Sequence, residues 1–189
     1  MPLHFLTTSK NKFAEVQRFF PEVEMLSVDL PEIQEFDLQK IIEHKLETAQ
    51  NFLRYNSAHR VDQFFVEDSA LYIRCMNGFP GPLIKWMEKQ MKAEGIANLV
   101  MQHPERRATA KSMIGYVNLA VQPMETRYFL GEVQGMIVQP RGKNDFGFGP
   151  IFLPDNVWKT FGEMTREEKD RYSMRGKVLR ELMGYLEKI

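Results

Sequence analysis

Two long runs of β-forming residues in the middle of the chain constrain its fold more than any other feature. They cover residues 108–121 and 126–138, and the short segment Gln122-Pro-Met-Glu joins them. Two such runs separated by a short turn segment are typical of a β-hairpin. We therefore expect a long hairpin in the middle of the chain.

Shorter strands and helices alternate around this hairpin. The order predicts an α/β protein with an elongated, mixed β-sheet flanked by helices. At 189 residues the chain fits one domain, 1–189, which could have two lobes. The other predicted strands cover residues 3–8, 23–28, 64–66 and 151–153, and the strand at 64–66 could continue over residues 71–73 after a kink. The predicted helices cover residues 11–20, 38–52, 83–92, 95–102, 165–171 and 173–189.

Two adjacent carboxylates follow the apolar strand at residues 64–66. Glu67 and Asp68, followed by Ser69, form an acidic turn in this interpretation. Ionised carboxylates are costly to bury unless a cation or hydrogen bonds compensate, and Mg²⁺ takes one or two carboxylates together with substrate phosphates. Glu32, in the loop after the second strand, could complete such a site. Exposed acids at a strand end are the alternative.

The segment between the first strand and the first helix is a second candidate site. Exposed N–H groups and the helix dipole at a helix N-terminus favour anions such as phosphate. A plain Ser9 cap with solvated lysines is the alternative, and no P-loop pattern G-x-x-x-x-G-K-[ST] occurs in the chain. The residues of the segment are Thr7, Thr8, Ser9, Lys10, Asn11 and Lys12.

A glycine-rich loop at residues 140–149 is a third candidate. Phe146 and Phe148 offer flat faces on which a base can stack, a contact worth about 1–3 kcal/mol in nucleic-acid binders. Gly147 and Gly149 would let the backbone approach a ligand closely. The alternative is a loop whose aromatic rings enter the core.

Several other classes of protein are excluded by what the sequence contains. The 25 basic and 25 acidic side chains balance, so no global field draws the protein to nucleic acid or an anionic membrane. The single cysteine, Cys75, cannot form a disulfide within the chain. The four histidines lack metal-ligand spacing, which argues against zinc. Asp145-Phe-Gly matches the kinase metal motif by chance, because the other kinase motifs are missing.

Five segments in order resemble the inosine triphosphate pyrophosphatase family, most closely its eukaryotic-type members. These enzymes hydrolyse non-standard purine nucleoside triphosphates to the monophosphate and pyrophosphate. The resemblance runs from the first strand to the last helix and implies an α/β fold with two lobes and a central nucleotide cleft. The segments are Asp29-Leu-Pro-Glu-Ile-Gln, Val66-Glu-Asp-Ser-Ala-Leu, Asn77-Gly-Phe-Pro-Gly-Pro-Leu-Ile-Lys-Trp86, Pro140-Arg-Gly-Lys-Asn-Asp-Phe-Gly-Phe-Gly-Pro-Ile-Phe152 and Thr160-Phe-Gly-Glu-Met-Thr-Arg-Glu-Glu-Lys169.

The resemblance also implies roles for individual residues. Glu32 and Asp68 would hold Mg²⁺, for which Mn²⁺ could substitute, and Asp68 would orient or deprotonate the attacking water. Catalysis would rest on Asp68, Glu67 and Lys12. The triphosphate would lie along residues 7–12 with Lys45, Lys85 and Ser69. The base would be bound by Phe146, Gly147, Phe148, Gly149, Lys169, Ser173, Met174 and Arg175.

Three positions depart from the family pattern. Met174 stands where a histidine usually reads the 6-oxygen of the base, and methionine cannot donate a hydrogen bond to a carbonyl. Gly149 replaces an aspartate, and Thr8-Ser9 replaces Gly-Asn. Two of the three changes affect base recognition. Our hypothesis is therefore that the substrate preference is shifted away from inosine and xanthosine triphosphates, toward a triphosphate with another base, such as a 6-amino or modified one.

The sequence therefore predicts a Mg²⁺-dependent nucleoside triphosphate pyrophosphatase of the cytoplasm that clears non-standard nucleotides from the pool. By analogy with the family we expect a homodimer. We expect no nucleic acid partner and no membrane partner. Two alternatives stay open: a nucleotide-binding protein of the same fold with little turnover, and a structural or interaction domain.

Overall fold

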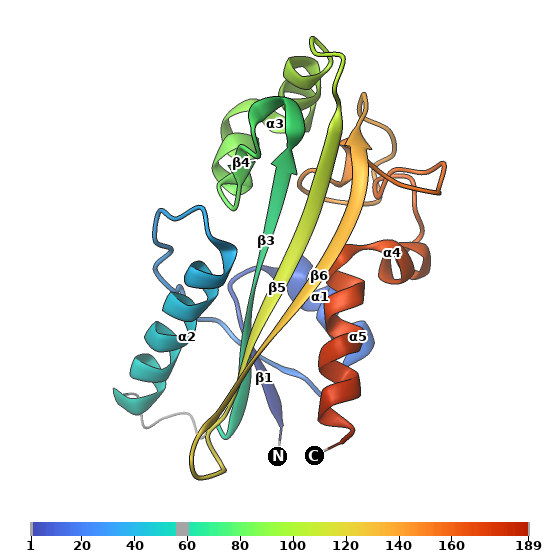
Figure 1. The fold of residues 1–189 in the computed structure, drawn as a ribbon. Coiled ribbons are helices and arrows are strands. Elements are labelled where there is room, and N and C mark those ends of the chain that lie inside the picture. The colour runs from blue at the N-terminus through green and yellow to red at the C-terminus, as the bar shows by residue number, and fades with distance from the viewer. Residues whose placement is uncertain (1, 56–60, 189) are drawn as a thin grey trace. The chain divides into compact units, whose positions relative to one another are not determined.

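The computed structural model describes residues 2–55 and 61–188 (Figure 1). Over these residues seven strands form one sheet, in the order β2-β1-β3-β5-β6-β7, and β4 pairs with β3. The strands are β1 (Leu3–Leu6), β2 (Glu24–Leu26), β3 (Gln63–Ile73), β4 (Pro80–Gly81), β5 (Arg107–Asn118), β6 (Glu125–Ile137) and β7 (Phe152–Pro154). The helices are α1 (Lys10–Phe19), α2 (Leu38–Tyr55), α3 (Ile84–Val100), α4 (Arg166–Tyr172) and α5 (Met174–Leu186), with short 3₁₀ turns η1 (Arg74–Met76) and η2 (Gly149–Ile151).

The sheet is mixed, as the sequence predicts. Strand β1 runs parallel to β2 and to β3, with His4 opposite both Glu24 and Phe64. Strand β3 runs antiparallel to β4, and β6 runs antiparallel to β7. The two long central runs form β5 and β6, which are neighbours in the sheet. The predicted α/β class is therefore confirmed.

The chain divides into two compact units. The first unit comprises Met1–Asp68, Met113–Leu130 and Val178–Ile189, and the second comprises Ser69–Ser112 and Gly131–Lys177. Strands β3, β5 and β6 contribute residues to both. The predicted nucleotide cleft stays a prediction.

The first unit has its own hydrophobic core between strands of the sheet and helices α1 and α5. The Phe5 and Phe65 rings stack with their centroids 4.6 Å apart, so neighbouring parallel strands are joined by aromatic contact as well as by backbone pairing. The core residues are Phe5, Val16, Val23, Phe65, Ile114, Tyr116, Val178, Leu179 and Leu182.

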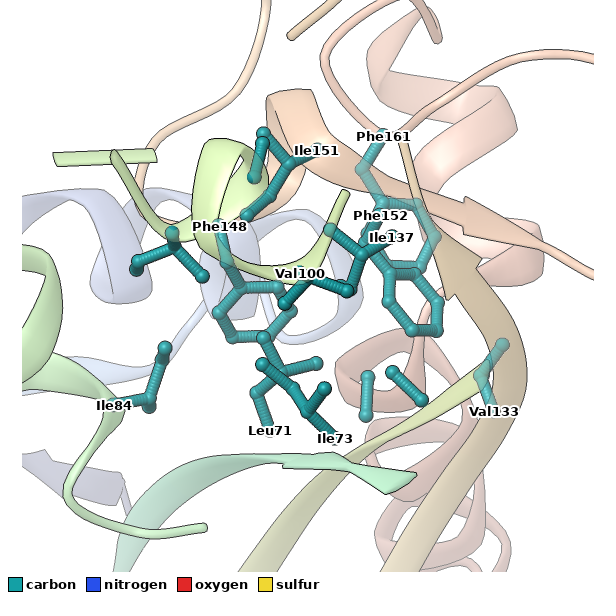
Figure 2. Close-up of a cluster of buried hydrophobic side chains, with 14 of the residues drawn as sticks. Leu71, Ile73, Ile84, Val100, Val133, Ile137, Phe148, Ile151, Phe152 and Phe161 are labelled. Carbon is teal, nitrogen blue, oxygen red and sulfur yellow. The ribbon is translucent and has the colours of Figure 1, made fainter. Parts of the chain in front are cut away.

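The core of the second unit gathers side chains from strands, from α3 and from the glycine-rich loop. Figure 2 shows the Phe148 ring inside this cluster with Leu71 and Val100. Phe148 also meets Phe152 edge-on at 6.2 Å between centroids. The labelled members are Leu71, Ile73, Ile84, Val100, Val133, Ile137, Phe148, Ile151, Phe152 and Phe161.

Helix starts follow the capping signals in the sequence. Ser9 caps α1, and its side chain accepts a hydrogen bond from the Lys12 backbone N–H. Thr165 and Glu168 form a reciprocal capping box at the start of α4. The two helices predicted at residues 83–92 and 95–102 both form within α3, and they are separated by a kink at Lys92, where the backbone is not helical (φ 59°, ψ 170°).

One prediction is wrong at the acidic segment. Glu67, Asp68 and Ser69 do not form a turn, because β3 runs without interruption from Gln63 to Ile73. The strand continues through Glu67 and Asp68 because lysines from helices α1 and α2 neutralise these two acids.

No α-helix among the described residues combines the length and the apolar character that a membrane span requires.

Candidate functional site

Three carboxylates and two ammonium groups meet in the first unit. We call Lys12, Glu32, Lys45, Glu67 and Asp68 the carboxylate–lysine cluster. Lys12 Nζ lies 2.8 Å from Glu67 Oε2 and 3.6 Å from Asp68 Oδ1. Lys45 Nζ donates to Glu32 Oε1 and to Asp68 Oδ2, each at 3.0 Å. Asp68 therefore links the two lysines.

Burial makes these ion pairs stronger than pairs on an open surface. The Glu67 side chain is fully buried and that of Lys45 is 8% exposed. Burial on its own acts to lower the pKa of Lys45, but the Asp68 and Glu32 carboxylates outweigh it and raise that pKa above its ordinary value. Lys45 thus carries its charge, and three carboxylates face two cations.

Secondary structure explains why these side chains converge. Lys12 lies in the first turn of α1, which follows β1, and Lys45 lies on the buried face of α2. Glu67 and Asp68 lie on β3, the strand that pairs directly with β1. Chain segments that are distant in sequence are therefore brought to one place by parallel pairing.

The predicted phosphate segment lies at the start of α1. Thr7 Oγ1 accepts a hydrogen bond from the Ser9 backbone N–H at 3.1 Å, and Ser9 Oγ accepts from the Lys12 N–H at 3.3 Å. Lys10 and Asn11 form the first turn of the helix. The segment therefore leads directly into the carboxylate–lysine cluster through Lys12.

A second group of side chains gathers around one aromatic ring in the second unit. We call Ser69, Asp145, Phe146, Lys169 and Arg175 the Phe146 cluster. Lys169 Nζ lies 4.8 Å and Arg175 Cζ 5.8 Å from the centroid of the Phe146 ring. Arg175 Nη2 donates to Ser69 Oγ at 2.8 Å. Both cations lie over the Phe146 ring, and both can only donate hydrogen bonds.

Asp145 belongs to this cluster although the sequence analysis set it aside. Its carboxylate pairs with Lys169 Nζ, and its side chain is 4% exposed. Its Oδ1 also accepts a hydrogen bond from the Phe146 N–H at 2.8 Å. The signal that could have identified it is its place directly before Phe146 in the glycine-rich loop.

Comparison with known proteins decides the family. A model of the Ham1 family matches residues 3–185. The chain belongs to the Ham1 family. It is 38% identical to the dITP/XTP pyrophosphatase of Thermococcus kodakarensis, over 98% of this chain and 97% of that protein. It is 31% identical to the inosine triphosphate pyrophosphatase of Schizosaccharomyces pombe, over 97% of this chain and 94% of that protein. The family resemblance in the sequence is confirmed.

Solved structures agree on the fold. The Ham1 protein of Staphylococcus aureus superimposes with a TM-score of 0.78 at 23% identity and covers 98% of both chains. A nucleoside-triphosphatase, or dITP/XTP pyrophosphatase, of Mycobacterium abscessus has a TM-score of 0.64 at 27% identity, over 96% of this chain and 98% of that one. The mixed α/β architecture is thus the fold of the Ham1 family.

Other predicted base-site residues of this Ham1-family chain have structural partners of their own. Phe148 and Met174 are 8% and 4% exposed and belong to the core of the second unit. Ser173 Oγ accepts from the Gly176 N–H at 3.0 Å, near the start of α5. Lys85 also lies in the second unit, with Nζ 5.6 Å from the Trp86 ring centroid. The Phe146 cluster therefore contains only part of the predicted set.

Proposed function

We propose that this Ham1-family chain hydrolyses non-standard purine nucleoside triphosphates, as ribonucleotides or deoxyribonucleotides, and so clears them from the nucleotide pool. Water attacks the α-phosphorus, the bond to the α–β bridging oxygen breaks, and the products are nucleoside monophosphate and pyrophosphate. The observation that carries the proposal is the carboxylate–lysine cluster, in a chain 38% identical to a dITP/XTP pyrophosphatase.

The cluster supplies the charges that this cleavage needs. The Asp68 carboxylate orients the attacking water and accepts its proton. The Lys12 and Lys45 ammonium groups stabilise the negative charge that develops on the pyrophosphate, because fixed charges aimed at a developing charge lower the barrier. Glu67, fully buried beside Lys12, holds that lysine in place. The hydroxyls of residues 7–9 would contact the triphosphate, and the role of Lys85 stays a prediction from the sequence.

The same cluster fits a hard divalent cation. Glu32 Oε1 and Asp68 Oδ2 both lie 3.0 Å from a single point of positive charge, Lys45 Nζ. No group of three or more acidic, histidine or cysteine side chains among residues 2–55 and 61–188 is placed to share a metal. Two carboxylates completed by phosphate oxygens and water are what Mg²⁺ accepts. We therefore propose that Glu32 and Asp68 hold Mg²⁺, or Mn²⁺, which when bound neutralises phosphate oxygens.

The Phe146 cluster supports a base with hydrogen-bond acceptors at its edge. A purine bound at the Phe146 ring meets Lys169 and Arg175, which can only donate hydrogen bonds to it. A carbonyl at position 6 accepts from these donors, whereas a 6-amino group does not. The cluster therefore supports 6-oxo purines, against the shift toward 6-amino bases expected from Gly149 and Met174. Neither residue belongs to the cluster.

The test is a panel of triphosphates with pyrophosphate release as the readout. ITP, dITP, XTP, GTP and ATP are each assayed with Mg²⁺, with Mn²⁺ and with a chelator. We expect release from ITP, dITP and XTP, dependence on a divalent cation, and a slower reaction with ATP. Asp68→Asn should lower turnover by at least about a hundredfold, within the range for loss of a general base, and should keep nucleotide binding. Glu22→Gln, at an exposed acid, is the matched control.

Each alternative has its own result in this panel. A fully active Asp68→Asn variant contradicts the assignment of the centre. Tight binding of ITP by the wild-type chain without turnover favours a nucleotide-binding protein. No binding of any triphosphate favours an interaction domain. The single domain 1–189, the homodimer and the cytoplasmic location remain predictions from the sequence.

A further inference from the structure

The space beside Gly149 is filled by the side chain of Asp145. A Cβ added to Gly149 would overlap the Asp145 carboxylate and would lie 2.8 Å from the Asp145 Cβ. Real Cβ atoms do not approach other atoms so closely, so any larger residue at 149 must displace Asp145. The absence of a side chain at 149 and the position of the Asp145 carboxylate are therefore linked.

That carboxylate does two things at once. Its Oδ1 accepts from the Phe146 backbone N–H at 2.8 Å and pairs with Lys169 Nζ. The Lys169 side chain is 8% exposed, so its ammonium group is held in a largely dehydrated place, where charge-assisted hydrogen bonds are strong. Asp145 Oδ1 thus fixes the position of the Lys169 ammonium relative to the backbone of Phe146.

A second carboxylate lies near this pair. Glu88 Oε2 lies 3.4 Å from the position that a Cβ on Gly147 would take. Burial raises the pKa of Glu88; Lys92 opposes this rise, and the Asp145 charge adds to it. The Glu88 carboxylate is therefore repelled by the negative charge of Asp145.

We propose that Asp145 is a positioning residue that sets base specificity, and that it can act only because Gly149 leaves it room. It holds the Lys169 ammonium at the Phe146 ring, where the ammonium donates to a carbonyl oxygen of the bound purine. This inference rests on the proposed function. Neither the Gly149 nor the Lys169 position alone reveals this determinant of base specificity.

The test uses two variants that break the same contact in different ways. Asp145→Asn removes the charge and keeps the shape, whereas Gly149→Ala keeps the charge and displaces the carboxylate. Each should lower kcat/KM for ITP by about tenfold, the loss of one charge-assisted hydrogen bond, mainly through KM. The value for ATP should stay the same. The double variant should be no worse than either single one, because residues acting through one contact are not additive.

The control is Gly184→Ala on α5, where an added Cβ meets nothing within 4 Å; it should leave both substrates unaffected. Affinities for IMP and AMP are measured in parallel, so that the IMP:AMP ratio decides the inference even if the wild-type chain turns over no triphosphate and the proposed function fails. The inference is overturned if both variants keep the wild-type ratio of kcat/KM for ITP to that for ATP, or the wild-type ratio of affinities for IMP and AMP. Equal losses for both bases together with a lower Tm also overturn it, because they indicate a purely structural role.

Discussion

At the scale of single residues, Lys45 stands out because one ammonium group satisfies two carboxylates. Glu32 and Asp68 each lie 3.0 Å from it, and they are 30% and 15% exposed. A buried charge that loses its partner costs more than the pair contributes, because the remaining charge stays dehydrated. The cluster is therefore stable only while each carboxylate keeps a cation beside it.

Lys45→Met removes the ammonium and keeps the length of the side chain. We expect the free energy of unfolding to fall by about 1–3 kcal/mol, the cost of unsatisfied buried polar groups, in chelator and at neutral pH. Added Mg²⁺ should recover part of this loss, because a metal held by Glu32 and Asp68 replaces the missing charge. Lys45→Arg, which keeps the charge, is the control. Thermal unfolding that is the same for Lys45→Met and wild type would contradict the role of Lys45.

Most residues of the two clusters can be predicted from the sequence, and the others cannot for a physical reason. Local patterns predict Lys12, Glu32, Glu67 and Asp68, whereas Lys45 follows only from the family resemblance. Local patterns do not predict Asp145, because its proposed role depends on the space at Gly149, four residues later in the chain. Contacts of that kind follow from side-chain packing, which periodicity in a sequence does not encode.

At the scale of elements, the sequence predicts the helices and strands well and the acidic segment incorrectly. Two consecutive acids indicate a strand end when only their own cost of burial is counted. The ammonium groups that offset this cost come from α1 and α2, which are distant in sequence. Strand β3 therefore continues to Ile73, and Asp68 is fixed within a sheet.

Helix α2, which carries Lys45, packs directly on β5 through a glycine. A Cβ at Gly115 would lie 2.5 Å from Ile42 Cγ2 and 2.7 Å from Leu46 Cδ1. Gly115→Ala should therefore push the helix outward, with a loss of stability of about 1–3 kcal/mol, the usual cost of overpacking.

Thermal unfolding measures this effect, and a Tm lower by about 2–4 °C per kcal/mol is expected for a chain of this size. Turnover of ITP should also fall, because Lys45 moves with α2. Gly184→Ala, in open space on α5, should not lower the Tm. A Gly115→Ala variant as stable as wild type would show that α2 does not rest on β5 at this glycine.

At the scale of the whole molecule, two compact units each enclose a core and each carry one of the clusters. The carboxylate–lysine cluster belongs to the first unit and the Phe146 cluster to the second. The residues proposed for cleavage and the residues proposed for base recognition thus belong to separate cores. Substitutions at the two clusters should affect different kinetic parameters, kcat for the first and KM for the second.

The stability of the whole chain should fall at alkaline pH because of Tyr116 in the first core. Burial, with smaller contributions from Tyr185 and Glu125, raises the pKa of Tyr116 from 10.0 to about 12. Between these values the unfolded chain releases the phenol proton and the folded chain keeps it. The contribution of Tyr116 to the free energy of unfolding is therefore complete below pH 10 and is lost as pH rises toward 12.

Denaturant unfolding of wild type and Tyr116→Phe across this pH range checks the effect. The variant should lose less stability than wild type as pH rises, although at neutral pH it lacks the hydrogen bond from Tyr116 Oη to Gln63 Oε1 at 3.0 Å. Tyr55→Phe, at an 83% exposed side chain, should follow the wild-type slope. Parallel curves for wild type and Tyr116→Phe would exclude Tyr116 as the cause.

The central claim is that the chain cleaves a nucleoside triphosphate between the α- and β-phosphates with the carboxylate–lysine cluster. The most direct measurement is the identity and ratio of the products formed from ITP in the presence of Mg²⁺, for wild type and Asp68→Asn. We predict IMP and pyrophosphate in equal amounts from the wild-type chain and almost none from the variant. IDP and phosphate as the products would contradict the claim. So would an Asp68→Asn variant that forms as much IMP and pyrophosphate as the wild-type chain.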